Sequence, residues 1–319
     1  MHDLIFCIMG PTGSGKTALA CELAQSAPFE IISVDSALVY RGMDIGTAKP
    51  RPEQLLQTPH HLIDILDPIQ SYSAAAFCQD ALHLCDQIFK RGKIPLLVGG
   101  TMMYFKALQQ GLSVLPQSDD LIRKQLEIQV RTQGLDALHH TLMQVDAKAA
   151  ARIHSHDAQR IQRALEVYYI TGRPLSDLTA QSKAKSPFRF INILLFPQQR
   201  TWLHERIALR FKHMLEAGFI DEVKKLQSTW DLNPQLPAMR CVGYKQVWDY
   251  LQGTLDYPTM TEKGIAATRQ LAKRQLTWLR SWEDGLYFDP QKDTFIGEIV
   301  AKIKEILDNG PSNAAKELL

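Results

Sequence analysis

Short, mostly apolar runs alternate with stretches of helical periodicity along the first third of the chain. The runs at residues 4–9, 31–36 and 94–98 are continuous, as is typical of strands buried on both faces of a sheet. Apolar positions recur three and four residues apart over 19–24 and 74–88, which predicts amphipathic helices between these strands. The order of these elements predicts an α/β fold with a doubly wound parallel sheet.

The pattern becomes helical beyond Pro116. Capping and terminating residues divide this stretch into helices. Ser118-Asp119-Asp120 caps the first helix and Gly134 ends it. Asp136 starts the second helix, and the third runs from Asp157 to Gly172. The next strand-like run, at 190–196, is expected to rejoin the sheet. We therefore expect three regions: a core of 1–115 and 189–310, a helical insertion domain at 116–188, and a loose tail at 311–319. Helical patterns in the last part of the core lie near 201–217, 219–228, 244–251 and 261–282.

Composition limits the class of protein. The net charge of +2 over 319 residues is too small to indicate a nucleic-acid partner by itself, so any basic surface must be local. The cysteines form no CxxC pair and no zinc-ligand spacing, which predicts reduced thiols in the cytoplasm: Cys7, Cys21, Cys78, Cys85 and Cys241. We expect no signal peptide and no membrane partner, because the apolar start runs directly into a glycine-rich loop and no run reaches membrane-spanning length.

The glycine-rich loop completes the pattern G-x-x-x-x-G-K-[ST] between a predicted strand and a predicted helix: Gly10, Pro11, Thr12, Gly13, Ser14, Gly15, Lys16 and Thr17. Its glycines let backbone amides turn toward a phosphate, and the helix N-terminus and Lys16 add positive charge. The Thr17 hydroxyl can ligate Mg²⁺. A chance glycine turn would not be expected to complete the motif in this context. The fold is therefore expected to be of the P-loop type, with a diphosphate or polyphosphate site.

Two polar residues end neighbouring strands at the same edge of the predicted sheet. Asp35 could ligate Mg²⁺ as in kinases, take a proton from an attacking group, or merely cap the next turn. Thr101 stands where many P-loop NTPases carry an aspartate, which weakens an ATP-hydrolysis interpretation. It could hydrogen-bond in the crevice, cap a helix, or do both.

Three segments outside the loop are locally basic. In the insertion, polar Gln159, Arg160, Gln162 and Arg163 surround apolar Ile161, and three interpretations stay open. The helix could be a solvated face in which Arg163 pairs with Glu166, a kinase-like lid, or an RNA-binding helix.

The other two basic segments lie near the C-terminal end. Arg269, Lys273, Arg274 and Arg280 have no acid between them, and Gln275, Thr277 and Trp278 lie among them. The segment Arg240-Cys241-Val242-Gly243-Tyr244-Lys245 adds basic and aromatic residues around a glycine turn. Trp278 and Tyr244 could equally pack in the core, the role we expect for Trp278. The three segments suggest a large polyanionic second substrate.

In several stretches the chain resembles the bacterial tRNA dimethylallyltransferases, also called tRNA isopentenyltransferases, of the IPP transferase family. The matching stretches follow one another along nearly the whole chain: 10–17, 34–36, 40–50, 98–101, 159–163, 240–245 and 272–280. The most specific is the run from Met43 to Pro50, MDIGTAKP. Gly13, Leu38 and Met102-Met103 depart from the commoner family residues, which affects details of substrate contact.

The resemblance implies transfer of a dimethylallyl group from dimethylallyl diphosphate to N6 of the adenosine 3′-adjacent to the anticodon in tRNAs. It implies Asp35 as the base, Thr101 as a hydrogen-bond partner of the amine, and Lys16 with Mg²⁺ at Thr17 neutralising the departing diphosphate. It also implies contact with the tRNA anticodon stem-loop by Asp35, Ser36, Ala37, Leu38, Thr101, Arg123, Gln159, Arg160, Ile161, Gln162, Arg163, Arg240, Cys241, Val242, Gly243, Tyr244, Lys245, Lys273, Arg274, Gln275, Leu276, Thr277, Trp278, Leu279 and Arg280. We expect a monomer, and the loop would also accept the phosphates of ATP.

Two rival functions use the same motifs. A small-molecule or nucleotide kinase would use the loop on ATP, but the absence of an acidic residue at the end of the third strand counts against it. An RNA-binding switch protein would couple nucleotide occupancy to affinity without transferring a group. A carboxylate placed to act as a base counts against that second rival.

Overall fold

The computed structural model describes residues 3–113, 115–180 and 186–309. The chain divides into two compact units, Met1–Gln109 with Ser186–Leu319 and Gln110–Lys185. The helical insertion expected at 116–188 overlaps the second unit. The tail expected at 311–319 lies outside the described residues.

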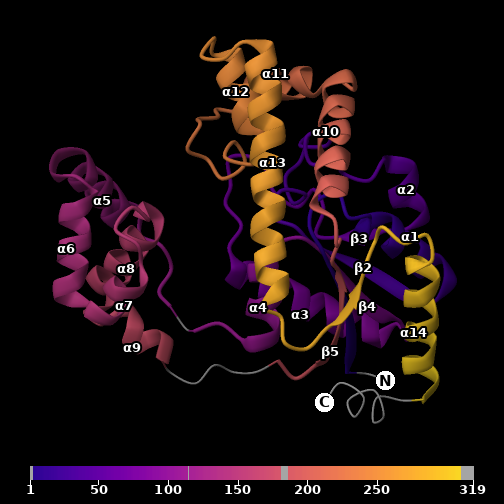
Figure 1. Ribbon diagram of the computed structural model, residues 1–319. Helices are drawn as coiled ribbons and strands as arrows, with labels where there is room; N and C mark the ends of the chain where they lie inside the picture. Colours follow the sequence, from indigo (N-terminus) through magenta and orange to yellow (C-terminus); the bar gives the residue numbers. More distant parts are fainter. Residues whose placement is uncertain (1–2, 114, 181–185, 310–319) are drawn as a thin grey trace. The chain divides into compact units, whose positions relative to one another are not determined.

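The first unit is built on one sheet, whose described strands are all parallel in the order β3-β2-β4-β1-β5-β6 (Figure 1). The strands are β1 Leu4–Met9, β2 Phe29–Val34, β3 His60–His61, β4 Ile94–Gly99, β5 Arg189–Leu195 and β6 Leu286–Phe288. The predicted α/β class with a P-loop-type parallel sheet is confirmed. β6 was not predicted from the sequence, because three residues are too few to form a recognisable apolar pattern.

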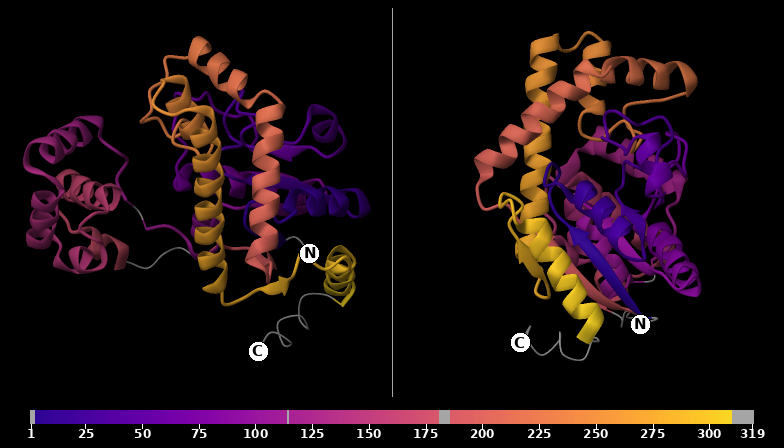
Figure 2. Two further views of the ribbon diagram at one scale, coloured as in Figure 1. Left: turned by 45° about the horizontal axis from the view of Figure 1, so that its top comes forward. Right: turned by 90° about the vertical axis from the view of Figure 1, so that its right-hand side faces the viewer.

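The helices of the first unit lie on both faces of this sheet and above its edge. They are α1 Lys16–Ser26, α2 Pro52–Gln57, α3 Ala74–Lys90, α4 Met102–Gln110, α10 Arg200–Glu216, α11 Phe219–Thr229, α12 Tyr244–Leu251, α13 Tyr257–Arg280 and α14 Phe295–Asn309. The predicted C-terminal helices correspond to α10 through α13, whereas α14 was missed. Figure 2 shows α10 and α13 as long helices lying side by side.

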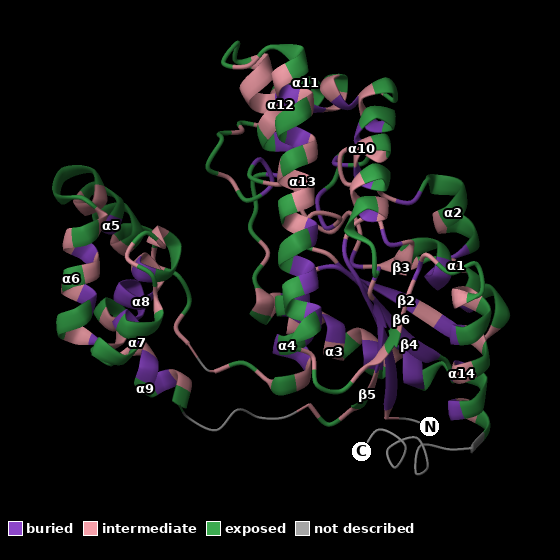
Figure 3. Cartoon of the chain, viewed as in Figure 1, coloured by how far each residue is buried: buried purple, intermediate pink, exposed green. Residues whose placement is uncertain are grey.

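Alternating side chains of β1 enter two cores, one on each face of the sheet. Ile5, Cys7 and Met9 pack with α3, α4, α10 and α13, while Leu4 and Phe6 pack with α1 and α14. Every residue of β1 is buried, and the central strands are purple in Figure 3. Burial on both faces explains why the strands appear in the sequence as continuous apolar runs.

The carboxyl ends of β1, β2 and β4 meet at one edge of the sheet because the strands are parallel. Met9 and Val34 both pair with Gly99 in the register of the sheet. A Cβ atom on Gly99 would lie 1.9 Å from the carbonyl oxygen of Val34, so a side chain cannot be accommodated there. This close approach brings the phosphate loop and the residues after β2 and β4 together.

The second unit packs α5 Asp120–Gln133, α6 Leu135–Val145, α7 Ala147–Arg152, α8 Ala158–Thr171 and α9 Leu175–Ala180. Asp119 and Asp157 cap α5 and α8 through their carboxylates, as their sequence positions predicted. The predicted start of α6 at Asp136 is wrong: Gly134, with φ of 83°, is its N-cap, and Asp136 lies within its first turn.

We predict that replacing Gly264 by alanine destabilises the protein. A Cβ at Gly264 in α13 would lie 2.1 Å from the Phe211 ring, so an overpacking penalty of about 1–3 kcal/mol should exceed the ~1 kcal/mol that alanine gains in a helix. Urea unfolding measures the change. The matched control is Gly297→Ala in α14, where an added Cβ would meet nothing within 4 Å outside the backbone of its own helix, and no loss is expected. Equal stability of the two variants would contradict the close packing of α10 and α13.

Candidate active site

A cavity of about 480 Å³ opens at the carboxyl edge of the sheet, and all of its lining residues belong to the first unit. This volume lies within the usual range of small-molecule sites, ~300–1,000 Å³. The cavity brings together many of the predicted site residues: Thr12, Gly13, Lys16, Thr17, Asp35, Ser36, Ala37, Leu38, Thr101, Arg240, Cys241, Val242, Tyr244 and Gln275.

The glycine-rich loop takes a compact, preformed shape between β1 and α1. Gly13 and Gly15 have φ values of 84° and 91°, a region that only glycine enters without strain. The Ser14 amide donates to the Pro11 carbonyl, and the Lys16 ammonium donates to the same oxygen at 2.8 Å. The Ser14 hydroxyl is buried without a partner among the described residues. Gly10 to Thr17 thus form the shape that phosphate binding requires.

Positive charge gathers in the cavity beside this loop. Burial, followed by the nearby Arg210 guanidinium, lowers the pKa of Lys16 to about 8, and the Asp35 carboxylate opposes this shift. Burial also lowers the pKa of Arg210, again against the effect of Asp35. Within the described part of the chain neither Lys16 nor Arg210 forms an ion pair, and Asp35 is the one carboxylate that lines the cavity with them, so the cavity is suited to an anion.

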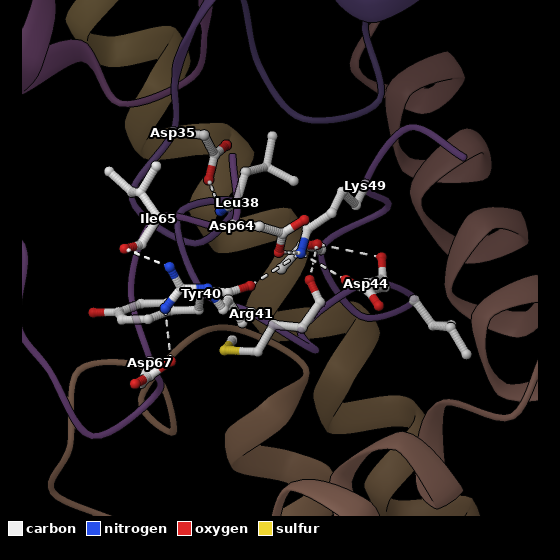
Figure 4. A network of polar contacts seen from close by, with 12 residues as sticks. Asp35, Leu38, Tyr40, Arg41, Asp44, Lys49, Asp64, Ile65 and Asp67 are labelled. Carbon is white, nitrogen blue, oxygen red and sulfur yellow. Dashed lines mark hydrogen bonds and ion pairs between the residues drawn. The ribbon is translucent and has the colours of Figure 1, made fainter. Parts of the chain in front are cut away.

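Asp35 lies just beyond β2, in the wall of the cavity. Its Oδ1 accepts hydrogen bonds from the amides of Ala37 at 2.8 Å and Leu38 at 3.3 Å (Figure 4). No protein donor reaches Oδ2 among the described residues. The carboxylate therefore caps the following turn with one oxygen and keeps the other for a group in the cavity.

Thr101 connects the ends of β2 and β4. Its hydroxyl accepts from the Ser36 amide at 3.1 Å and donates to the Ser36 hydroxyl at 3.5 Å. It does not cap α4 through its side chain, contrary to one of the predicted roles. Thr101 instead fixes the turn that carries Asp35 and lines the cavity beside it.

Gln275 ties α13 to the loops at this edge. Its carbonyl oxygen accepts from the Thr12 amide at 2.8 Å, and its amide donates to the Gly100 carbonyl at 2.9 Å. The side chain is buried, and its role is to support the phosphate loop. The side chains of four other predicted residues are also buried: Ile161, Tyr244, Leu276 and Leu279. Contact of Gln275 and these four residues with RNA stays a prediction.

The remaining predicted residues of α13 lie along its exposed surface: Lys273, Arg274, Thr277, Trp278 and Arg280. Trp278 is 36% exposed, with the Lys106 ammonium 5.5 Å from its ring centre, so the core position expected for it is wrong. Arg280 lies over the Phe196 ring. The cavity lining does not include four residues of the glycine-rich loop, Gly10, Pro11, Ser14 and Gly15. It also does not include Gly243 and Lys245 of the segment 240–245.

The segment 240–245 forms another wall of the cavity. Burial, with a smaller effect from Asp35, raises the pKa of the Cys241 thiol to about 12, so the thiol stays protonated. The Cys241 thiol donates to the Pro237 carbonyl, and Arg240 is exposed. Gly243, with φ of 92°, allows the turn into α12, and Lys245 pairs with Asp249.

Residues 46–48 also line the cavity, and the segment 44–48 to which they belong is held by two charged side chains. The Glu222 carboxylate accepts hydrogen bonds from the amides of residues 44, 45 and 46 and from the Tyr244 hydroxyl at 2.6 Å. The Lys49 ammonium is buried and binds the Tyr40 carbonyl and the carboxylates of Asp44 and Asp64 (Figure 4). Glu222 thereby connects the two walls of the cavity.

The second unit contains its own charged centre. The Glu166 side chain is 2% exposed and accepts from Arg163 at 2.6 Å and from Arg123 at 2.8 Å. The predicted Arg163–Glu166 pair is present, although Glu166 is buried and not on a solvated face. Arg160 and Gln159 are exposed, and Gln162 is half-buried.

Two arginines of α10 near the phosphate loop were not among the predicted site residues. Arg206 donates to the Gly13 carbonyl at 2.9 Å and lies over the Trp202 ring, while Arg210 lines the cavity. Their four-residue spacing beside the apolar positions Ile207 and Phe211 was a usable signal, because it places both on the edge of the helix face that packs inward.

The cavity fits a magnesium ion held largely by a phosphate ligand. Thr17 lines it at the start of α1, where its hydroxyl is available. The described residues contain no cluster of three or more His, Cys, Asp or Glu side chains suited to a metal. Mg²⁺ commonly takes one or two protein ligands together with water and substrate phosphates, which agrees with this small donor set.

Among the described helices, none combines the length and apolar character needed to cross a bilayer.

We predict that diphosphate binding is coupled to protonation of Lys16. Because the pKa of Lys16 is about 8 in the free protein, the side chain loses its charge above that pH, and a bound anion must restore the proton. Affinity for inorganic diphosphate with Mg²⁺ should fall by about tenfold per pH unit above the pKa. Calorimetry in buffers of different ionisation enthalpy measures the proton uptake. The Lys16→Met variant is the control, because its pH profile reflects the ionisation of diphosphate without that of Lys16. Identical pH profiles for the two proteins would contradict the coupling.

We also predict that Glu222→Gln destabilises the protein by about 1–3 kcal/mol, because a carboxamide cannot accept from all four donors. Tyr244→Phe removes only one of them and should cost less. Urea unfolding measures both, with Glu216→Gln on the exposed surface of α10 as the control. The assignment of Glu222 as the connection between the walls would be wrong if its variant matched this control.

Comparisons with known proteins agree with this geometry. The sequence model of a family described as "IPP transferase" matches residues 38–282. The tRNA dimethylallyltransferase of Legionella pneumophila (strain Corby) is 62% identical over 313 residues, covering 98% of this chain and 100% of that protein. That of Coxiella burnetii (strain Dugway 5J108-111) is 54% identical over 306 residues, covering 96% and 98%.

Solved structures show the same relationship. The full-length tRNA isopentenylpyrophosphate transferase of Bacillus halodurans superposes with a TM-score of 0.71 at 38% identity, over 97% of this chain and 98% of that one. A eukaryotic dimethylallyltransferase described as acting on tRNA gives a TM-score of 0.82 at 29% identity, over 97% and 80%. The family match covers more than half of the chain, and the relatives align over nearly all of it. The chain therefore belongs to the IPP transferase family.

Proposed function

We propose that this protein transfers the dimethylallyl group of dimethylallyl diphosphate to N6 of the adenosine 3′-adjacent to the anticodon in tRNAs, releasing diphosphate. The observation that carries the proposal is that one cavity is lined both by residues of the phosphate loop, Thr12, Gly13, Lys16 and Thr17, and by Asp35. The curated relatives are named tRNA dimethylallyltransferases. The reaction is a prenyl transfer.

The phosphate loop binds the donor. The loop amides and the N-terminus of α1 face the diphosphate, and the Lys16 and Arg210 side chains add positive charge beside it. When the bond between the allylic carbon and the diphosphate oxygen breaks, the leaving oxygen gains negative charge that these groups stabilise. Mg²⁺ held at Thr17 would add Lewis-acid stabilisation of the same charge.

Asp35 receives the proton. As N6 of adenine forms its bond to the allylic carbon, the nitrogen becomes acidic and must lose one proton. The free Oδ2 of Asp35 takes it, while Oδ1 keeps the turn in place through Ala37 and Leu38. Thr101, beside Asp35, accepts a hydrogen bond from the amine. An adenine stacked in a loop cannot enter the cavity, so the base is extruded from the RNA.

The wider assignments follow from the same reaction. We propose that the protein acts as a monomer in the cytoplasm, a compartment in which unpaired cysteines such as those described here stay reduced. The ends of β2 and β4 carry one acidic residue, Asp35, in the cavity wall, and Thr101 replaces the metal-binding acid of many NTPases. The kinase alternative is therefore not favoured.

A transfer assay tests the function. The protein is incubated with Mg²⁺, undermodified tRNA and radiolabelled dimethylallyl diphosphate, and ATP replaces the prenyl donor in a parallel reaction. Label on tRNA is the expected result. Absence of label, with phosphate released from ATP, would support a kinase or nucleotide switch instead.

We predict that Asp35→Asn reduces the chemical step by about 10²–10⁴-fold, the usual contribution of a general base. The asparagine oxygen can still accept from Ala37 and Leu38, so the turn and the affinity for tRNA should be retained. Single-turnover kinetics and equilibrium binding separate the two effects. Normal turnover at saturation with weakened tRNA binding would contradict the role of Asp35 as the base.

A further inference from the structure

A second, smaller depression of about 120 Å³ lies between α10 and α13. Its rim is formed by Arg200 and His204 from α10 and by Lys273 and Arg280 from α13, and its floor includes Leu203. It shares no lining residue with the cavity of the candidate active site. The depression is therefore a separate feature of the first unit.

The charges around this depression are all of one sign. No carboxylate lines it, and within the described part of the chain none of its three rim cations, Arg200, Lys273 and Arg280, forms an ion pair with an acid. Cations held close together without counter-charge repel one another, and a bound anion relieves this repulsion. The residues fit a phosphate group with several donors.

His204 adds a titratable donor to the rim. Burial, followed by Arg269 and Arg200, lowers the pKa of His204, so the ring is neutral near pH 7 in the free protein. The other charged groups that face the depression are Lys273 and Arg280, both on α13. An anion seated there would offset all of these cations and favour the protonated ring.

We propose that this depression binds a phosphodiester group of the tRNA backbone, which adds Arg200 and His204 to the RNA-binding surface. The inference rests on the proposed function. RNA is favoured over a second small diphosphate because the rim continues into the exposed, acid-free residues Arg274, Thr277 and Trp278 of α13. Cations spread over two helices match an extended polyanion, whereas the phosphate loop already provides a compact site for diphosphate.

Equilibrium binding of a tRNA anticodon stem-loop, without any prenyl donor, tests this site. The affinity is measured over a salt series for the wild type, Arg200→Ala and Arg200→Lys. Removing one phosphate contact should reduce the slope of log affinity against log salt by about 0.7–0.9, and lysine should restore most of it. The control is Lys212→Ala, which removes a positive charge from the exposed surface of α10 away from the depression.

The His204→Gln variant gives an independent readout. Wild-type affinity should rise as the pH falls from about 8 to about 6, because the bound phosphate favours the charged ring, and the variant should lose much of this dependence. Unchanged salt slopes and pH profiles relative to Lys212→Ala would overturn the proposal. If the Arg200 and His204 variants instead lost affinity for inorganic diphosphate and kept RNA binding, the proposal would also be overturned. The depression would then bind the diphosphate of the prenyl donor.

These outcomes are separable from those of the transfer assay. If the wild type transfers no prenyl group but Arg200→Ala lowers the salt slope, the proposed function fails and the phosphate site stands. If transfer occurs and the slopes do not change, the phosphate site fails alone.

Discussion

The arrangement of the cavity depends on one buried carboxamide, that of Gln275. It accepts from the phosphate loop at Thr12 and donates to Gly100 after β4, so it connects α13 to two strand ends across the sheet edge. A polar group at such a position is costly unless both of its ends are satisfied. Here both ends are, and the same bonds that stabilise α13 also fix the loop that faces the anion.

Charged side chains stabilise part of the cavity wall by satisfying backbone polar groups, which apolar side chains could not do. The 44–48 segment presents backbone amides, which require acceptors, and Glu222 supplies them from α11. Lys49 similarly satisfies a carbonyl and two carboxylates while almost fully buried. An irregular segment has backbone polar groups that no helix or sheet pairs. Hydrogen bonds from side chains must therefore satisfy these groups and define the shape of the segment.

Local pattern was sufficient for the central strands, the phosphate loop and the helix starts at Asp119 and Asp157, because each depends on neighbours within a few residues. β6 was missed because three residues carry little periodicity. α14 was missed although its buried Ile299, Ile303 and Ile306 recur at helical spacing. The structural role of Gln275 could not be foreseen, since its partner Thr12 lies 263 residues away along the chain. The surface position of Trp278 could not be foreseen either, since its ring lies beside the Lys106 ammonium of α4, which is distant in sequence.

The second unit carries a feature with its own consequence. Glu166, buried beneath two guanidinium groups, accepts a hydrogen bond from Nε of Arg123, and among the described residues the terminal nitrogens of this half-exposed side chain have no partner. A long arginine ordinarily loses rotamer entropy when it grips a ligand. At Arg123 much of that loss has already occurred during folding, so the orientation of this cation is set before any anion binds.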